Sequence, residues 1–275
     1  IIGLCIAIIC LPARAWNQGV MEVVFIEVGQ GDCILVKTPQ GRFVLVDGGG
    51  SQFYDVGTRK VLPYLKHRGI RTIDLAINTH PDIDHLGGLE TVIEEVKVRY
   101  VGIPSSLYGC REYASLIEKG ERYGIPLLLL KGGDRLDIEE KVTVQVLDHG
   151  SPALSDFNDQ SIVLHLKYRE FSAILCGDLG TKGLQQLSFA HSQTPVTVVK
   201  VPHHGSRSSL LPEFYDRIKP AYAVISVGKN NRFGHPHPEV IDELAGRNIL
   251  TYRTDVHGAV TVLSDGFTIR VKSYH

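Results

Sequence analysis

The chain has 275 residues, of which 43% are hydrophobic and 21% are charged, and its formal net charge is −1. This length and composition suit one large globular domain or two small ones, with ample apolar material for a core. A nearly neutral chain exerts no overall electrostatic attraction on nucleic acid, so binding to DNA or RNA would have to rest on a local site.

The first 18 residues differ in composition from the rest of the chain. Residues 1–11 carry no charge, and Pro12, Arg14 and Trp16 follow them. The apolar run is too short to span a bilayer, which takes about 20 residues. We interpret residues 1–18 as the end of a transmembrane segment and a linker, with Arg14 and Trp16 at the membrane interface. A signal-peptide core and an N-terminal hydrophobic strand are the alternatives.

From Gly19 onward the pattern predicts a single α/β domain over residues 19–275. Apolar, β-branched runs predict strands at 21–29, 33–38, 42–47, 73–79, 98–104, 125–130, 141–150, 160–168, 171–178, 195–201, 221–228, 249–254, 259–264 and 267–273. Helical spacing predicts helices at 57–70, 86–96, 111–124, 180–189, 211–219 and 237–248. Strands followed by helices in each half indicate two stacked β-sheets with helices outside.

Polar side chains recur where the predicted strands end, which is where rigid scaffolds carry chemistry. These residues are Asp32, Asp47, His80, Asp178 and His203. By contrast, Cys33 and Cys176 lie inside apolar runs, and we interpret them as buried small hydrophobes. The cysteines number five and none has CxxC spacing, which argues against a disulfide framework or a zinc–cysteine site.

The segment HPDIDH crowds two histidines and two aspartates into a short stretch directly after an apolar strand. A turn there can point His80, Asp82, Asp84 and His85 into one space. Imidazole and carboxylate are both metal ligands, and two of each can serve two neighbouring cations. The alternative is a helix N-cap, in which Asp82 or Asp84 bonds the first turn of the following helix.

Two later segments carry the same kind of chemistry. Asp178 ends an apolar strand between Gly177 and Gly180, so it could bridge two metals or simply form a turn. In VPHHGSRSS, one of His203 and His204 could ligate a metal while the other donates a proton or holds a phosphate oxygen. The residues that follow are phosphate partners unless the segment is a polar surface turn: Ser206, Arg207 and Ser208.

Other histidines lie in less specific settings. The loop NNRFGHPHPE carries Arg232, His235 and His237, and either histidine could reach the same cleft. His165 alternates with apolar neighbours in a strand, and we expect it to face solvent or to pair locally.

In this order the segments resemble the metallo-β-lactamase superfamily, whose hallmark is HxHxDH after a strand, with an earlier Asp, a later bridging Asp and a final His. Asp47, Asp178 and His203 or His204 match those positions, while Asp82 stands where the second His is expected. The stretches FIEVGQGDCILV, FNDQSIVLHL and VPHHGSRSS are similar to the C-terminal domain of ComEC-type competence proteins, the inner-membrane DNA-uptake channels of bacteria. The resemblance implies a four-layer αββα fold, with two stacked mixed β-sheets and outer helices.

The resemblance also implies two divalent metal ions. The implied ligands are His80, Asp82, Asp84, His85, Asp178 and His203, and the implied catalytic residues are Asp84, His204 and His235. Asp47, Asn158 and Asp32 are implied as further ligands or as supports of the ligands, and Ser206, Arg207 and Arg232 as phosphate partners. Relatives supply another His before the bridging Asp, where this chain offers only His149, Asn158 or Asp159. A site poor in nitrogen favours Mn²⁺, with Zn²⁺ as the alternative.

The function implied is a metal-dependent phosphodiesterase that cuts DNA, in particular the strand that is not imported during natural transformation. Two alternatives stay open: another hydrolase of the same fold, such as a lactamase, thioesterase or phosphorylcholine esterase, or a degenerate domain that only binds DNA. The implied partners are DNA and the rest of the membrane channel, with no organic cofactor. The implied location is the bacterial inner membrane, with this domain soluble and extracytoplasmic.

Overall fold

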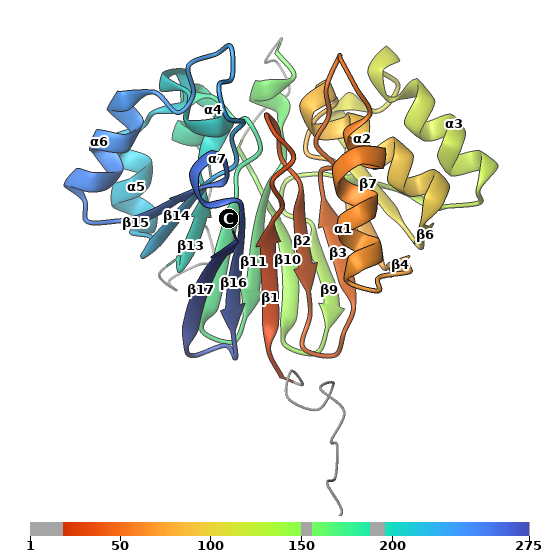
Figure 1. The fold of residues 1–275 in the computed structure, drawn as a ribbon, viewed down its shortest axis with the longest axis horizontal. Coiled ribbons are helices and arrows are strands. Elements are labelled where there is room, and N and C mark those ends of the chain that lie inside the picture. The colour runs from red at the N-terminus through yellow and green to blue at the C-terminus, as the bar shows by residue number, and fades with distance from the viewer. Residues whose placement is uncertain (1–18, 150–155, 188–195, 275) are drawn as a thin grey trace, which may run out of the picture.

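The structure is a computed structural model that describes residues 19–149, 156–187 and 196–274 (Figure 1). The predicted end of a transmembrane segment, residues 1–18, lies outside the described residues. Among the helices that are described, none combines the length and apolar character needed to cross a membrane.

Two β-sheets stack face to face and helices cover their outer faces (Figure 1). The first sheet has eight strands, in the spatial order β17 (Ile269–Tyr274), β16 (Ala259–Ser264), β1 (Met21–Phe25), β2 (Ile34–Lys37), β3 (Phe43–Val46), β5 (Leu75–Ile77), β7 (Val101–Pro104) and β8 (Leu127–Leu130). Strands β17 to β3 pair antiparallel, whereas β3, β5, β7 and β8 pair parallel. A separate two-stranded sheet joins β4 (Thr72–Ile73) to β6 (Lys97–Val98).

The second sheet has seven strands, in the spatial order β15 (Leu250–Arg253), β14 (Tyr222–Ile225), β13 (Val198–Lys200), β12 (Phe171–Leu175), β11 (Val163–Tyr168), β10 (Val142–Leu147) and β9 (Arg135–Glu139). Strands β12 to β15 are parallel, and β9 to β12 form an antiparallel meander. Both sheets are therefore mixed, and the predicted four-layer αββα architecture is confirmed.

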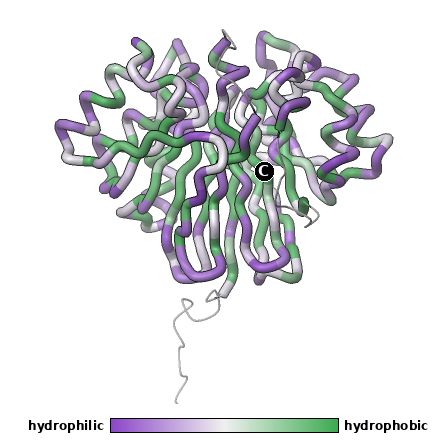
Figure 2. The backbone as a smooth tube through the Cα atoms, turned by 180° about the vertical axis from the view of Figure 1, so that it is seen from behind, coloured by the Kyte–Doolittle hydropathy of each residue, from purple (hydrophilic) through white to green (hydrophobic). Residues whose placement is uncertain are grey.

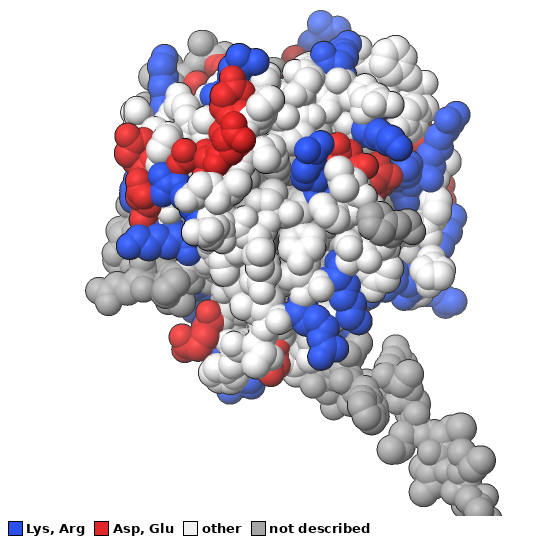
Figure 3. Space-filling view, turned by 60° about the vertical axis from the view of Figure 1, so that its left-hand side comes forward, with Lys and Arg blue, Asp and Glu red and all other residues white. Residues whose placement is uncertain are grey.

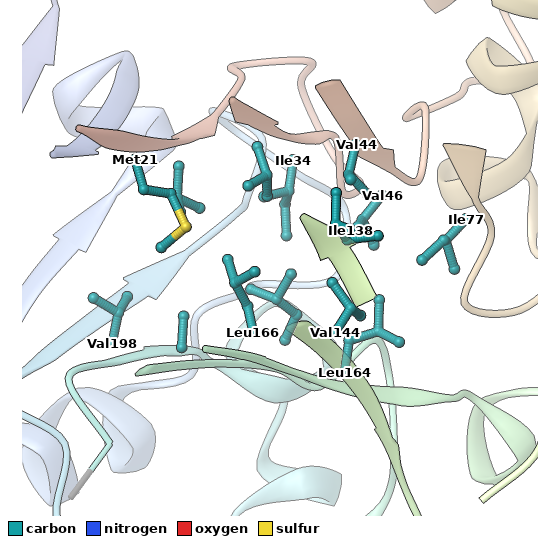
Figure 4. Close-up of a cluster of buried hydrophobic side chains, with 14 of the residues drawn as sticks. Met21, Ile34, Val44, Val46, Ile77, Ile138, Val144, Leu164, Leu166 and Val198 are labelled. Atoms are coloured by element: carbon teal, nitrogen blue, oxygen red, sulfur yellow. The ribbon is translucent and has the colours of Figure 1, made fainter. Parts of the chain in front are cut away.

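The main core lies between the sheets. Alternate residues of β1, Met21, Val23 and Phe25, face alternate residues of β11, Leu164 and Leu166. Figure 4 shows side chains from both sheets pointing into this shared layer. The opposite faces of the strands are also buried, because helices cover them, so the strands read as nearly continuous apolar runs. Figure 2 shows the strands as largely hydrophobic and the hairpin turns at their lower ends as hydrophilic.

Six helices of the outer layers agree with the predicted positions. On the first sheet these are α1 (Leu62–His67), which continues from a π-helical turn at Gly57–Val61, α2 (Ile83–Glu95) and α3 (Ala114–Arg122). On the second sheet they are α4 (Thr181–Gln186), α5 (Pro212–Ile218) and α6 (Pro238–Gly246). The sequence patterns missed β9, whose residues alternate with charged side chains, and the short helix α7 (Thr254–His257).

The surface carries no large field of one charge on the face that Figure 3 shows, where the α6 side of the molecule comes forward. Acidic and basic side chains mix in small groups around a broad uncharged area (Figure 3). This mixture agrees with the formal net charge of −1. On this face, recognition of a charged ligand would therefore have to come from a local arrangement of side chains.

Candidate metal centre

The polar residues at the strand ends meet at one end of the sandwich. Asp47 directly follows β3, His80 comes shortly after β5, and Asp178 comes shortly after β12. His203 and His204 lie in the short 3₁₀ turn Pro202–Gly205, which follows β13. Because these strands run parallel to their neighbours, their carboxyl ends gather the loops from both sheets in one place.

Helix α2 begins at Ile83, earlier than the predicted start at residue 86. Asp84 and His85 therefore lie in the first helical turn and not in a preceding loop, which fixes their directions. Asp82 stands at the N-cap position, but its side chain makes no capping hydrogen bond. The alternative interpretation, in which the Asp82 side chain caps the helix, is therefore wrong.

The glycine loop after β3 packs directly on α2. The backbone N–H of Gly48 donates to the carbonyl of His85 at 2.7 Å, and that of Gly88 donates to Gly49 at 2.8 Å. A Cβ on Gly88 would lie 2.1 Å from the carbonyl oxygen of Gly48, so only glycine permits this approach. This close packing of the loop on α2 holds Asp47, which directly precedes the loop, against His85.

Four side chains lie close together: Asp84, His85, Asp178 and His204. The Nε2 atoms of His85 and His204 lie 3.3 Å apart. The Nε2 of His85 is 3.3 Å from Oδ1 of Asp178, and that of His204 is 3.2 Å from Oδ2 of the same carboxylate. Asp84 Oδ2 is 3.5 Å from the Nε2 of His204. Two imidazole nitrogens facing each other among carboxylates form a set that suits a divalent cation.

Each histidine of this group is held by its other nitrogen. His204 Nδ1 donates to the backbone carbonyl of Ser226 at 2.8 Å, and His85 Nδ1 lies 2.9 Å from Oδ2 of Asp47. Asp47 is in turn bound by the side chains of Asn78 and Thr79, at 2.9 and 2.8 Å. Such contacts fix the tautomer and aim the Nε2 lone pair at a metal. Asp47 thus contacts His85 at the nitrogen opposite the one that faces His204, and Asp32, Asp47 and His85 also form a group of metal-capable side chains.

A second, poorer group surrounds His80. Its Nδ1 is 3.0 Å from the Thr79 hydroxyl, while its Nε2 is buried and makes no hydrogen bond. Asp82 Oδ2 lies 3.7 Å from that Nε2, and His80 also groups with His85 and Asp178. A buried nitrogen without a partner is the opening that a cation would fill, so the residues present fit a metal here as well.

No described residue clearly replaces the missing histidine of the family pattern. Among the described residues, the groups of metal-capable side chains include neither His149 nor Asp159. Asn158 begins a 3₁₀ turn, Asn158–Gln160, and its Oδ1 is buried without a hydrogen-bond partner.

Burial and the charges of neighbouring side chains shift the pKa values of the residues in the cluster. Burial and the neighbouring His85 hold the pKa of His80 well below its usual value. Burial opposes ionisation of Asp178, but His204 and His85 outweigh it and hold the pKa of that carboxyl well below its usual value. Burial, with Asp84 adding to it, raises the pKa of Asp82 to about 6. Despite burial, the pKa of Asp84 is lowered as well, chiefly by His204 and His85. Against the same effect of burial, Asp178 and the neighbouring carboxylates raise the pKa of His204 to about 9 and hold that of His85 well above its usual value. Of the buried histidines at the centre, His80 is therefore the one held neutral by its surroundings, and a cation at His85 and His204 would have to displace protons.

The two adjacent histidines differ in position. Both have left-handed backbone angles, with φ of 48° at His203 and 53° at His204, which turns their rings apart. His204 is buried in the cluster, whereas His203 is a quarter exposed and its Nε2 is 3.8 Å from Asp178. Of the two, His204 is therefore the residue that the structure brings into the cluster, whereas His203, expected as a metal ligand, lies at its rim.

The predicted phosphate partners lie outside the cluster. The guanidinium of Arg207 lies 3.5 Å from Glu239, and the Ser206 hydroxyl is 2.9 Å from that of Ser208. Arg232 stacks on Phe233 with 4.9 Å from Cζ to the ring centre. His237 Nδ1 accepts the backbone N–H of Arg207 at 3.1 Å, which occupies that nitrogen.

His235 does reach the centre. Its ring lies 5.7 Å from that of His203 and 6.5 Å from that of His204, and its Nδ1 is buried without a hydrogen-bond partner. Burial, with the nearby His204, lowers its pKa to about 4, which keeps the ring neutral.

Lys200 is a residue of the centre that the sequence patterns did not single out. It ends β13, is fully buried, and donates to the Gly177 carbonyl at 2.8 Å. It also pairs with Asp32 and lies 3.4 Å from Oδ1 of Asp178. The available signal was a lysine within the apolar run VTVVKV, directly before the two histidines.

Comparison with known proteins places the chain among relatives of one family. Residues 26–229 match the sequence profile of the family described as the metallo-beta-lactamase superfamily. The chain is 33% identical over 252 residues to ComE operon protein 3 of Bacillus subtilis, covering 87% of this chain and 32% of that protein. It is 29% identical over 237 residues to competence protein ComA of Neisseria gonorrhoeae, covering 85% and 31%. Recombination protein 2 of Haemophilus influenzae is 26% identical over 263 residues, covering 95% and 31%. The chain thus spans about a third of the length of these relatives.

Solved structures share the fold at low identity. CmlA, a diiron beta-hydroxylase from Streptomyces venezuelae, superposes with a TM-score of 0.55 at 16% identity, over 88% of this chain and 53% of that one. A diphosphatase from the PhnP family gives 0.52 at 12% identity, over 93% of this chain and 100% of that one.

Proposed function

This chain belongs to the metallo-beta-lactamase superfamily, and on that premise we propose that it is a metal-dependent phosphodiesterase domain that hydrolyses DNA. The observation that carries the proposal is the set of close contacts among Asp84, His85, Asp178 and His204, beside a second group around His80 and Asp82. Divalent ions held there would supply an activated water and would neutralise charge on a phosphate.

The residues of the chain would divide the work. Asp178 lies between the two groups and contacts both, so it would hold the relative position of the two ions. His235, with a free buried Nδ1 at the rim, would hold a phosphate oxygen by its N–H. Ser206, Arg207 and Arg232 would meet the substrate further out, once Arg207 exchanges Glu239 for a phosphate.

The choice of metal follows from the donors. Asp82 takes the place of an imidazole, so the His80 group is rich in oxygen, which favours Mn²⁺ over Zn²⁺. The choice of substrate follows from the relatives, two of which are named as competence and recombination proteins. We propose that the substrate is the DNA strand that is not imported, and that the parent protein resides in the bacterial inner membrane with this domain on the extracytoplasmic side.

The test is cleavage of plasmid and linear DNA with Mn²⁺, Mg²⁺, Zn²⁺ or EDTA. We expect cleavage with Mn²⁺ that is lost in EDTA and in Asp84→Ala, and that is unchanged in Asp137→Ala, an exposed carboxylate of β9. Binding of DNA without cleavage by any metal would favour a non-catalytic DNA-binding domain instead. Turnover of a lactam or a phosphocholine ester, but not of DNA, would favour another hydrolase.

A further inference from the structure

A cleft with a volume of about 590 Å³ adjoins the metal centre. Five segments form it: the loop between β1 and β2, the glycine loop after β3, the π-helical turn before α1, the start of α2, and the loop after β14. Asp84, one of the four side chains that lie close together in the centre, also lines this cleft. The cleft therefore opens directly onto the place where a phosphate would react.

The walls of the cleft present aromatic rings to solvent. Phe53 is 86% exposed and Phe233 is 47% exposed, and Ile83, which also lines the cleft, is 45% exposed. Large apolar side chains on one surface, all lining the same cleft, mark a binding surface and not random exposure. An exposed ring offers a flat face on which a nucleobase can stack, whatever its identity.

The charges of the cleft suit a polyanion once the metal centre is filled. Lys60, Lys229 and Arg232 line it, together with the acidic Glu27 and Asp84. Glu27 is neutralised by Lys60 at 2.6 Å. In the described part of the chain, no ion pair includes Lys229 or Arg232, so both cations are available to a phosphate.

A row of stacked groups connects the cleft to the centre. Arg232 lies over Phe233, and Phe233 stacks on His235 with ring centres 5.6 Å apart and planes inclined by 22°. His235 then lies beside His203, at 5.7 Å. A strand with one phosphate at the centre would place its next nucleotides along this row, in reach of Lys229 and Arg232.

We propose that this cleft binds the nucleotides next to the scissile phosphate of single-stranded DNA, with bases stacked on Phe53 and Phe233 and phosphates on Lys229 and Arg232. This inference rests on the proposed function, because it takes the metal centre as the place of cleavage. Base pairing hides the faces of bases within a duplex, so the aromatic rings favour a single strand or a frayed end. The cleft would thus give the domain its preference for unpaired DNA.

The test is binding of a fluorescent thymidine oligonucleotide and of a hairpin duplex of equal length, by anisotropy, in EDTA and again with Ca²⁺. Phe53→Ala and Phe233→Ala should each weaken binding of the single strand about tenfold, the scale of a lost base–aromatic stack. Lys229→Ala should weaken it and reduce its salt dependence. Phe267→Ala and Lys272→Ala, an exposed aromatic and an exposed lysine outside the cleft, are the matched controls and should bind as the unaltered chain does.

The proposal is overturned if both phenylalanine variants bind the single strand as tightly as the unaltered chain, or if the controls weaken binding equally. It is also overturned if the duplex binds as tightly as the single strand with the same dependence on Phe53 and Phe233. Failure of the proposed function has a different signature, since binding by the cleft is measured without turnover. If binding depends on the phenylalanines but Mn²⁺ supports no cleavage, the proposed nuclease activity is refuted while the proposed binding of DNA by the cleft stands.

Discussion

Lys200 and Asp32 form an ion pair that is buried beneath the metal centre, with 0% and 1% of their side chains exposed. Lys200 also binds the Gly177 carbonyl at 2.8 Å and approaches Asp178 at 3.4 Å. The pair therefore connects the end of β13, the loop after β12 and the loop after β1. Burial alone would lower the pKa of Lys200, but Asp32 and Asp178 outweigh it and keep the amine charged.

Removing either Lys200 or Asp32 should destabilise the folded state. We expect Lys200→Met to lower the free energy of unfolding by about 3 kcal/mol or more, because it removes the ammonium group from the buried Asp32 carboxylate and leaves it with the more distant His85 and His204. Asp32→Asn should cost a similar amount, and the double variant should cost less than the sum of the two. The measurement is urea unfolding in EDTA. Additive losses in the double variant would contradict a coupled pair.

The control for that experiment is a surface pair. Arg135 and Asp137 lie 2.9 Å apart on β9, and both are well exposed. Arg135→Met should therefore change the free energy of unfolding by less than about 1 kcal/mol.

The second prediction distinguishes the two adjacent histidines. We expect His204→Ala to weaken Mn²⁺ binding more than tenfold, because its Nε2 faces Asp84, Asp178 and His85. His203→Ala should change that affinity little, since its ring lies at the rim. Isothermal titration with Mn²⁺ measures both, with the exposed His67→Ala as control. Equal losses in the His203 and His204 variants would contradict this distinction between the two histidines.

The third prediction concerns the support of a ligand. Asp47→Asn keeps the shape of the side chain but removes the charge that orients His85 at 2.9 Å. Metal affinity should fall by about 10- to 100-fold while the circular dichroism spectrum is unchanged. Asn also tolerates the left-handed backbone found at this position, where φ is 57°, so a folding defect is not expected. The exposed Asp55→Asn is the matched control, and an unaltered affinity in Asp47→Asn would show that Asp47 has no supporting role.

Much of this architecture could be predicted from the sequence, because both faces of most strands are buried and the strands therefore read as apolar runs. The polar residues that interrupt those runs, such as Asp47, His80 and Asp178, mark the end of the sandwich where the centre lies. Strand β9 could not be recognised, since Arg135 and Asp137 are exposed at the edge of the sheet and break the apolar pattern.

Other features depended on three-dimensional context that no local pattern contains. The identity of the buried histidine, His203 or His204, is set by two left-handed residues in succession, which the sequence HHG does not specify. Lys200 resembles an outward residue of an alternating strand, and only the approach of Asp32 from the other sheet makes its burial possible. Phe53 and Phe233 are far apart in the chain, so the cleft they line appears only when the loops of both sheets are brought together.

The last prediction concerns pH and a residue outside the metal centre. His165, expected to face solvent or to pair locally, is fully buried on β11 and lies 2.9 Å from the Ser172 hydroxyl on β12. Burial, with Lys167 adding to it, lowers its pKa to about 4 from an ordinary value of 6.5. Above pH 6.5 the ring is neutral in both states; between 6.5 and 4 only the unfolded chain takes the proton, so the folded state loses stability as the pH falls. We expect the free energy of unfolding of the unaltered chain to fall, between about pH 7.5 and about pH 5, by about 2 kcal/mol more than that of His165→Gln. Urea unfolding at the two pH values measures this difference. A parallel pH dependence in the two proteins would show that His165 does not contribute to it.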